Sequence, residues 1–205
     1  MLEGIGLECV RGERTLFRGL GFRLERGALL RVAGENGSGK TSLLRIVCGL
    51  TPPAAGELRW QGENIRSLRE DYWKELVYIG HANALKDDLT AQENLRIGCR
   101  LAGLTASPRQ TADALERFGV GRCAQLPARV LSQGQRRRVA LARLGVSAEL
   151  PLWVLDEPFT ALDAAAVDNL QALVGEHLSR GGAVMLTTHQ EVGIAAAGGR
   201  LDLSA

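Results

Sequence analysis

The chain has 205 residues, of which 45% are apolar and 23% charged, and its formal net charge is +2. These values are typical of a globular protein, and the length favours one compact unit. The longest stretch without Asp, Glu, Lys or Arg, residues 46–56, is shorter than the roughly 20 residues that a membrane-spanning helix needs. The first residues lack the features of a secretory signal. We therefore expect a cytosolic chain that does not cross a membrane, and the weak charge argues against a nucleic-acid partner.

The hydrophobic pattern predicts an α/β core interrupted by a helical insert. Strands are expected over residues 2–9, 21–24 and 28–33, followed by a glycine-rich turn and a helix over 41–50. Sequences typical of capping boxes precede two helices near 91–103 and 108–118. The last third predicts a strand over 152–155, a helix over 164–178, a strand over 183–188 and a short tail.

A glycine-rich segment between a strand and a helix matches the P-loop pattern G-x-x-x-x-G-K-[ST]. In such loops the backbone N–H groups surround the phosphates of a nucleotide such as ATP. Lys40 is expected to reach the β- and γ-phosphates, and Thr41 to coordinate Mg²⁺. The predicted phosphate-binding residues are Gly34, Glu35, Asn36, Gly37, Ser38, Gly39, Lys40, Thr41 and Ser42.

An apolar run that fits one buried strand ends in two acidic residues, Asp156 and Glu157. Carboxylates at the end of a buried strand are either solvated or matched by a cation, because an unpartnered buried charge is unfavourable. After a P-loop in the same chain, we expect Asp156 to hold Mg²⁺ and Glu157 to polarise the attacking water.

A third motif, Leu-Ser-Gln-Gly-Gln over residues 131–135, begins another helix. A plain helix start is one interpretation, with Arg136, Arg137 and Arg138 on the solvated side. However, the motif resembles the signature of ABC-transporter ATPases. Residues 160–163 resemble the D-loop of that family, and residues 187–189 resemble its switch-histidine loop.

This resemblance covers the whole chain and implies a P-loop NTPase core of ABC type with an N-terminal antiparallel β subdomain. Residues 1–205 would form a single nucleotide-binding domain with a helical subdomain inserted at about 89–145. The resemblance also implies an ATP-bound homodimer in which two chains pair head to tail, and a catalytic role for His189 at the γ-phosphate. Four further residues would then contact nucleotide: Ser132, Gly134, Gln135 and Asp163.

The chain departs from the general family pattern at two positions. His81 stands where the family has a glutamine beside the metal, and Arg11 lies where an aromatic residue usually stacks on adenine. Imidazole can accept a hydrogen bond from metal-bound water, and a guanidinium plane can stack on a base. We therefore assign His81 to the metal site and Arg11 to the base. His177 lies outside any motif, and we expect it at the surface.

Smaller variations around the shared motifs, including Gly80-His81 and Leu186 to Gln190, resemble the ATPase subunits of the haem exporters of bacterial cytochrome c maturation. This resemblance implies polytopic membrane subunits as partners, a peripheral position on the cytoplasmic face of the inner membrane, and no direct contact with haem. Two alternatives remain open. One is an ABC ATPase subunit for another transported substrate, and the other is a soluble ABC ATPase acting on DNA or ribosomes.

Overall fold

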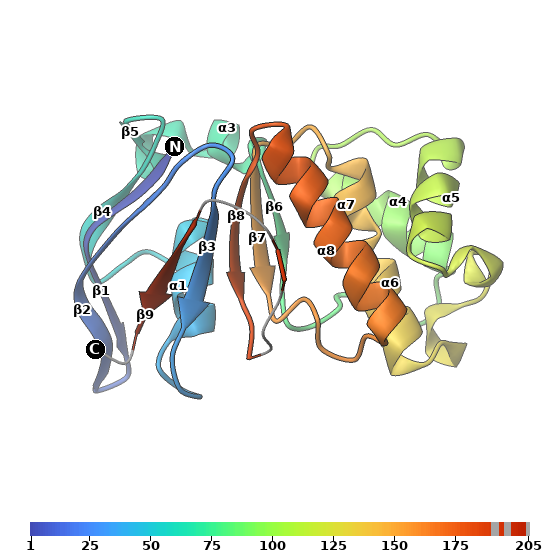
Figure 1. The fold of residues 1–205 in the computed structure, drawn as a ribbon, viewed down its shortest axis with the longest axis horizontal. Coiled ribbons are helices and arrows are strands. Elements are labelled where there is room, and N and C mark those ends of the chain that lie inside the picture. The colour runs from blue at the N-terminus through green and yellow to red at the C-terminus, as the bar shows by residue number, and fades with distance from the viewer. Residues whose placement is uncertain (190–192, 195–197, 204–205) are drawn as a thin grey trace.

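The computed structural model describes residues 1–189, 193–194 and 198–203. It contains two sheets, which lie at the left and centre of Figure 1. The first is antiparallel, with strand order β2-β1-β4-β5, and the second is parallel, with order β6-β7-β8-β3-β9. The strands are β1 (Leu2–Arg11), β2 (Arg14–Leu24), β3 (Leu29–Ala33), β4 (Ala55–Trp60), β5 (Glu63–Asn64), β6 (Leu76–Ile79), β7 (Leu152–Asp156), β8 (Ala183–Thr187) and β9 (Gly198–Asp202).

Helix α1 (Lys40–Val47) lies between the two sheets (Figure 1). Its four apolar side chains at helical spacing, from Leu43 to Val47, are buried. They belong to one hydrophobic cluster with residues of β1, β3, β4 and β7. The position of the P-loop, which leads directly into α1, is therefore fixed by packing on both sides.

The other helices are α2 (Ile65–Leu68), α3 (Glu70–Trp73), α4 (Ala91–Leu101), α5 (Pro108–Arg117), α6 (Gln133–Leu141), α7 (Arg143–Val146) and α8 (Ala164–Ser179), with 3₁₀ turns at Gly121–Cys123 and Ala128–Val130. The short helices α2 and α3 contribute to the same hydrophobic cluster as α1. Helices α4 to α8 cover the opposite face of the parallel sheet and extend beyond its edge (Figure 1), and a second hydrophobic cluster joins them to this face. Within the described ranges, no helix has both the length and the apolar character that a bilayer span requires.

The helix starts agree closely with the sequence pattern. Thr90, Ser107 and Ser132 each accept a hydrogen bond from the backbone three residues later, and each forms a complete capping box. Most predicted strands are also present, but β2 begins at Arg14 and therefore much earlier than residue 21. The described part of the expected tail forms β9, which pairs with β3.

The expectation that His177 lies at the surface was wrong. His177 is 2% exposed and stacks on Trp153, with ring centroids 3.9 Å apart and planes 8° from parallel. The interpretation of residues 131–135 as a plain helix start placed Arg137 on the solvated side, but Arg137 is 3% exposed. Both positions lie on helices whose inward faces cover the parallel sheet, so tertiary packing determines their burial and local polarity does not.

Candidate functional site

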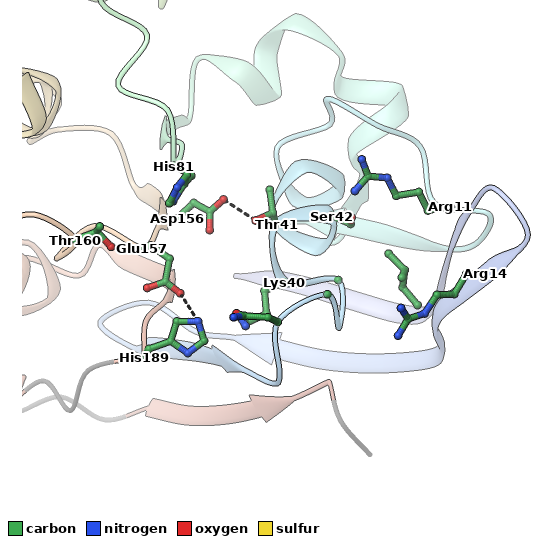
Figure 2. A pocket seen from close by; sticks show the side chains of 14 residues that line it. Arg11, Arg14, Lys40, Thr41, Ser42, His81, Asp156, Glu157, Thr160 and His189 are labelled. Atoms are coloured by element: carbon green, nitrogen blue, oxygen red, sulfur yellow. Dashed lines mark hydrogen bonds and ion pairs between the residues drawn. The ribbon is translucent and has the colours of Figure 1, made fainter. Parts of the chain in front are cut away.

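A cavity of about 690 Å³ opens where the P-loop faces the carboxyl ends of β7 and β8. Ligand sites of α/β sheets commonly occupy this edge. Figure 2 shows side chains from both sides of the molecule pointing into it. The lining residues are Arg11, Arg14, Leu16, Asn36, Gly37, Gly39, Lys40, Thr41, Ser42, His81, Asp156, Glu157, Thr160 and His189.

The P-loop leads into the first turn of α1 through Gly39, whose φ of +104° lies in a region that favours glycine. A Cβ at this position would come within 3.1 Å of the Leu16 side chain. Lys40 Nζ donates to the carbonyl oxygens of Gly34, at 2.7 Å, and Glu35, at 3.0 Å. The ammonium group is thus held at the mouth of the loop by two neutral acceptors.

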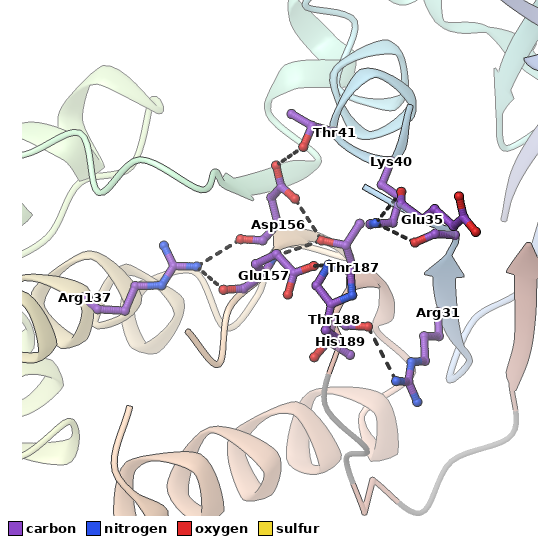
Figure 3. Close-up of polar contacts among 11 residues, drawn as sticks. Arg31, Glu35, Lys40, Thr41, Arg137, Asp156, Glu157, Thr187, Thr188 and His189 are labelled. Atoms are coloured by element: carbon purple, nitrogen blue, oxygen red, sulfur yellow. Dashed lines mark hydrogen bonds and ion pairs between the residues drawn. The ribbon is translucent and has the colours of Figure 1, made fainter. Parts of the chain in front are cut away.

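Asp156 lies at the end of β7 and is 1% exposed. Its carboxylate accepts hydrogen bonds from two hydroxyl groups, those of Thr41 at 2.9 Å and Thr187 at 2.8 Å (Figure 3). In the part of the chain that the structure describes, no cationic side chain forms an ion pair with this carboxylate. Burial, followed by the negative charge of Asp156, raises the pKa of Tyr78 to about 12. Asp156 therefore supplies a buried negative charge directly beside the P-loop.

Glu157 follows Asp156 and faces the same cavity, with Oε1 lying 3.4 Å from His189 Nε2 (Figure 2). Its φ of +47° is uncommon for a residue with a side chain. Its backbone N–H donates to Thr187 Oγ1 at 2.9 Å. A carboxylate and an imidazole are thus adjacent at the open edge of the sheet.

The opposite end of the cavity lies at the turn between β1 and β2. Arg11, Arg14 and Leu16 line it there, and no Phe, Tyr or Trp side chain of the described residues contributes to the lining. His81 lies on the other side, next to Asp156 (Figure 2).

Four further predicted nucleotide-binding residues form a separate group outside this cavity: Ser132, Gly134, Gln135 and Asp163. Ser132 and Gln135 close the capping box of α6, and Asp163 caps α8 while pairing with Arg138 at 3.0 Å. Gly134 lies against the backbone of Ala161, whose carbonyl oxygen would be 2.9 Å from a Cβ at this position. The starts of α6 and α8 therefore meet at one surface, and these four residues do not line the cavity of the same chain.

Comparison with known proteins identifies the family. The ABC transporter family model matches residues 17–160. Over 196 residues the chain is 57% identical to the "Cytochrome c biogenesis ATP-binding export protein CcmA" of Nitrosospira multiformis, covering 96% of this chain and 95% of the relative. The protein of the same name from Aromatoleum aromaticum is 54% identical, covering 100% and 95%. The chain belongs to the CcmA family of ABC transporter ATP-binding proteins.

Solved structures agree with this assignment to the ABC ATPases. An ATP-binding subunit of an ABC transporter superposes with a TM-score of 0.82 at 26% identity, covering 92% of this chain and 79% of the other. A dimeric ATP-binding cassette in a post-hydrolysis state, bound to ADP and Pi, superposes with a TM-score of 0.81 at 22% identity, covering 93% and 88%. The latter likeness concerns the fold alone. The CcmA-family chain is therefore an ATPase with the α/β fold of an ABC nucleotide-binding domain.

Sequence reasoning missed several residues at the site. Arg14, Leu16 and Thr160 line the cavity, and Thr187 contacts both acidic residues. Thr160 and Thr187 lie inside recognised motifs, so their positions could have indicated a role. Arg14 and Leu16 had no such signal, because the start of β2 was not recognised as a strand.

Proposed function

We propose that this chain is the ATP-hydrolysing subunit of the ABC exporter of cytochrome c biogenesis, and that it hydrolyses ATP in the cavity between the P-loop and β7. The observation that carries the proposal is the meeting of Lys40 and Thr41 with Asp156 and Glu157 in one cavity of a CcmA-family chain. The exporter would use the free energy of ATP turnover to deliver haem, or release a haem-loaded chaperone, for periplasmic cytochrome c assembly.

The P-loop is proposed to hold the triphosphate. The backbone of residues 34–39 and the start of α1 supply N–H groups, and Lys40 supplies a cation that can exchange its two carbonyl partners for phosphate oxygens. Ser42 lines the same wall. Arg11 is proposed to stack on the base, since it lies at the far end of the cavity from Glu157.

The oxygen donor groups of the site fit Mg²⁺. Thr41 and Asp156 provide hydroxyl and carboxylate oxygens within 2.9 Å of each other, and oxygen ligands are those that Mg²⁺ prefers. Asp156 also has a buried negative charge without a cationic partner in the described chain. Thr41, Asp156 and His81 would hold the ion, which when bound neutralises charge on the transferring phosphate.

Glu157 is the proposed general base. Its carboxylate reaches the cavity from the end of β7 and would accept a proton from the water that attacks the γ-phosphate. His189, 3.4 Å away, is proposed to contact the γ-phosphate and to orient Glu157.

A homodimer of nucleotide-binding domains is proposed for the ATP-bound state. Ser132, Gly134, Gln135 and Asp163 lie outside the cavity of their own chain, and Ser132 is exposed. In a head-to-tail pair these residues would contact the nucleotide bound by the partner chain. We expect a monomer to hydrolyse ATP slowly for this reason.

We also infer that residues 1–205 form one nucleotide-binding domain with a helical subdomain at about 89–145, and that this subdomain receives the polytopic membrane subunits. The exposed apolar side chains of Ile97 and Leu101 on α4 support a docking role, with 43% and 85% of their surface exposed. The chain would then sit peripherally on the cytoplasmic face of the bacterial inner membrane. No nucleic acid and no direct haem contact are part of the proposal.

The test is ATP turnover by Glu157→Gln, with Glu176→Gln as the matched control. Glu176 is an exposed carboxylate on α8 that pairs with Arg117, far from the cavity. We expect Glu157→Gln to bind ATP, to accumulate as a dimer, and to lose turnover by about 100-fold or more. Wild-type turnover in Glu157→Gln would contradict the assignment of the base.

A further inference from the structure

Arg137 is a buried cation that contacts the backbone of Asp156 and Glu157, and the proposed chemistry does not use it. It lies one turn into α6, which begins just after the exposed Ser132. Its guanidinium group points away from solvent and toward the end of β7 (Figure 3). Burial lowers the pKa of Arg137, and the charges of Asp156 and Glu157 act in the opposite direction.

Every N–H of this guanidinium has an acceptor. A guanidinium carries five N–H donors in a fixed planar arrangement. Nη2 donates to the carbonyl oxygens of Asp156, at 3.0 Å, and Glu157, at 2.8 Å. Nη1 donates to the carbonyl oxygen of Gly80 at 2.9 Å and to Asn83 Oδ1 at 3.3 Å, and Nε donates to the Pro158 carbonyl oxygen at 3.4 Å.

The acceptors are four backbone carbonyls and one side-chain amide, and in the described chain no carboxylate forms an ion pair with Arg137. Buried charges are usually paired with an opposite charge. Here neutral dipoles satisfy the cation instead. The arrangement therefore specifies the positions of two backbone segments, those around Gly80 and Glu157, relative to α6.

The backbone of Glu157 needs such support. Its left-handed φ of +47° is an unfavourable conformation for a residue with a Cβ and persists only when neighbouring groups impose it. Thr187 Oγ1 holds its N–H and Arg137 Nη2 holds its carbonyl oxygen. The backbone N–H and the backbone carbonyl group of Glu157 are thus both held in place. The backbone in turn determines the direction in which the carboxylate of Glu157 points.

We propose that Arg137 is a positioning residue that fixes Glu157 and the segment preceding His81 to α6, so that the orientation of the general base depends on the position of α6. This inference rests on the proposed role of Glu157. Because α6 starts at the surface where a second nucleotide-binding domain would dock, movement of α6 on docking would be transmitted through one guanidinium group to the base.

The experiment compares Arg137→Gln and Arg137→Lys with a matched control, Arg136→Gln. Arg136 is the adjacent residue on α6 and contacts Ala128 and Asp87 instead. We expect kcat to fall about 10- to 100-fold in Arg137→Gln, because small misplacements of catalytic groups have effects of this size. We expect the Kd for ATP to stay within about twofold of wild type, with Arg136→Gln near wild type in both quantities.

Lysine retains the charge but has three donors without the planar arrangement, so Arg137→Lys should not restore kcat. Full rescue by lysine would overturn the positioning role. Thermal unfolding establishes that each variant is folded, and Arg137→Lys provides the same comparison if the glutamine variant does not fold. A folded Arg137 variant with wild-type kcat would also overturn the proposal.

A double-mutant cycle tests whether Arg137 acts through Glu157. In the Glu157→Gln background, Arg137→Gln should cause no further loss of turnover. An equal fold loss in both backgrounds would overturn the inference while leaving the proposed base intact. Wild-type turnover in Glu157→Gln alone would instead contradict the proposed function, so the two failures are distinguishable.

Discussion

Thr187 joins the two acidic residues of the site, and its replacement by valine provides a quantitative test. Its hydroxyl donates to Asp156 Oδ1 at 2.8 Å and accepts from the Glu157 N–H at 2.9 Å, and the side chain is fully buried. Valine has nearly the same shape and suits a strand, so the change removes the two hydrogen bonds and leaves little cavity. A buried N–H without a partner destabilises by about 1–3 kcal/mol, and a hydrogen bond to a charged group contributes about 1.5–3 kcal/mol.

These two effects overlap, and we expect Thr187→Val to lower the free energy of unfolding by about 3 kcal/mol. Thr187→Ser is the matched control, because it keeps the hydroxyl and removes one methyl group, with a loss of about 1 kcal/mol. Urea unfolding followed by tryptophan fluorescence is the assay, since Trp153 is buried in the adjacent strand β7. The slope of the free energy of unfolding against urea concentration should be the same in all three proteins. If valine and serine destabilise the protein equally, the hydroxyl does not join the two acidic residues as described.

Three further predictions follow from the geometry. Lys40→Ala should raise the Kd for ATP by about 100-fold, because it removes the cation at the P-loop. Equilibrium binding of a fluorescent nucleotide would measure this Kd. An unchanged affinity for ATP would contradict the role of Lys40. Arg11→Ala should weaken ATP binding about threefold to tenfold, and Arg11→Tyr should restore it. Arg18→Ala, an exposed residue on β2, is the control. Equal affinities for ATP in the Arg11→Ala, Arg11→Tyr and Arg18→Ala variants would exclude stacking by Arg11. Burial lowers the pKa of His177 to about 4, below the ordinary 6.5. The unfolded chain therefore gains a proton first as the pH falls from 6.5 to 4, and the wild type should lose about 3 kcal/mol of stability over this window relative to His177→Phe. Parallel pH profiles of the two proteins would contradict that prediction.

Short-range signals in the sequence predict much of this fold. The capping boxes at Thr90 and Ser107 identify two helix starts to the residue, because caps are local hydrogen-bond patterns. The strand that ends at Asp156 is equally clear from its apolar run. In contrast, the first half of β2 alternates weakly and contains exposed arginines and a glycine, so its pairing with β1 depends on the partner strand.

The residues of the site also divide into those that local sequence motifs predict and those whose role depends on tertiary contacts. Motifs predict which residues carry the phosphate and acid chemistry, because each motif is contiguous in sequence. Thr187 and Arg137 contact Glu157 from positions 30 and 20 residues away. Arg137 lies between two other arginines, and nothing in its local sequence indicates that its side chain crosses to β7. Such contacts depend on tertiary structure and require coordinates.

ATP turnover at Glu157 is expected to be needed for cytochrome c assembly. The direct measurement is a haem stain for c-type cytochromes in source cells whose only copy of this chain carries Glu157→Gln, compared with Glu176→Gln at matched protein levels. We expect loss of covalently bound haem in the Glu157→Gln strain, with other haemoproteins unchanged, and normal staining in the Glu176→Gln strain. Normal c-type cytochromes in the Glu157→Gln strain would contradict the claim and assign the ATPase to another transported substrate.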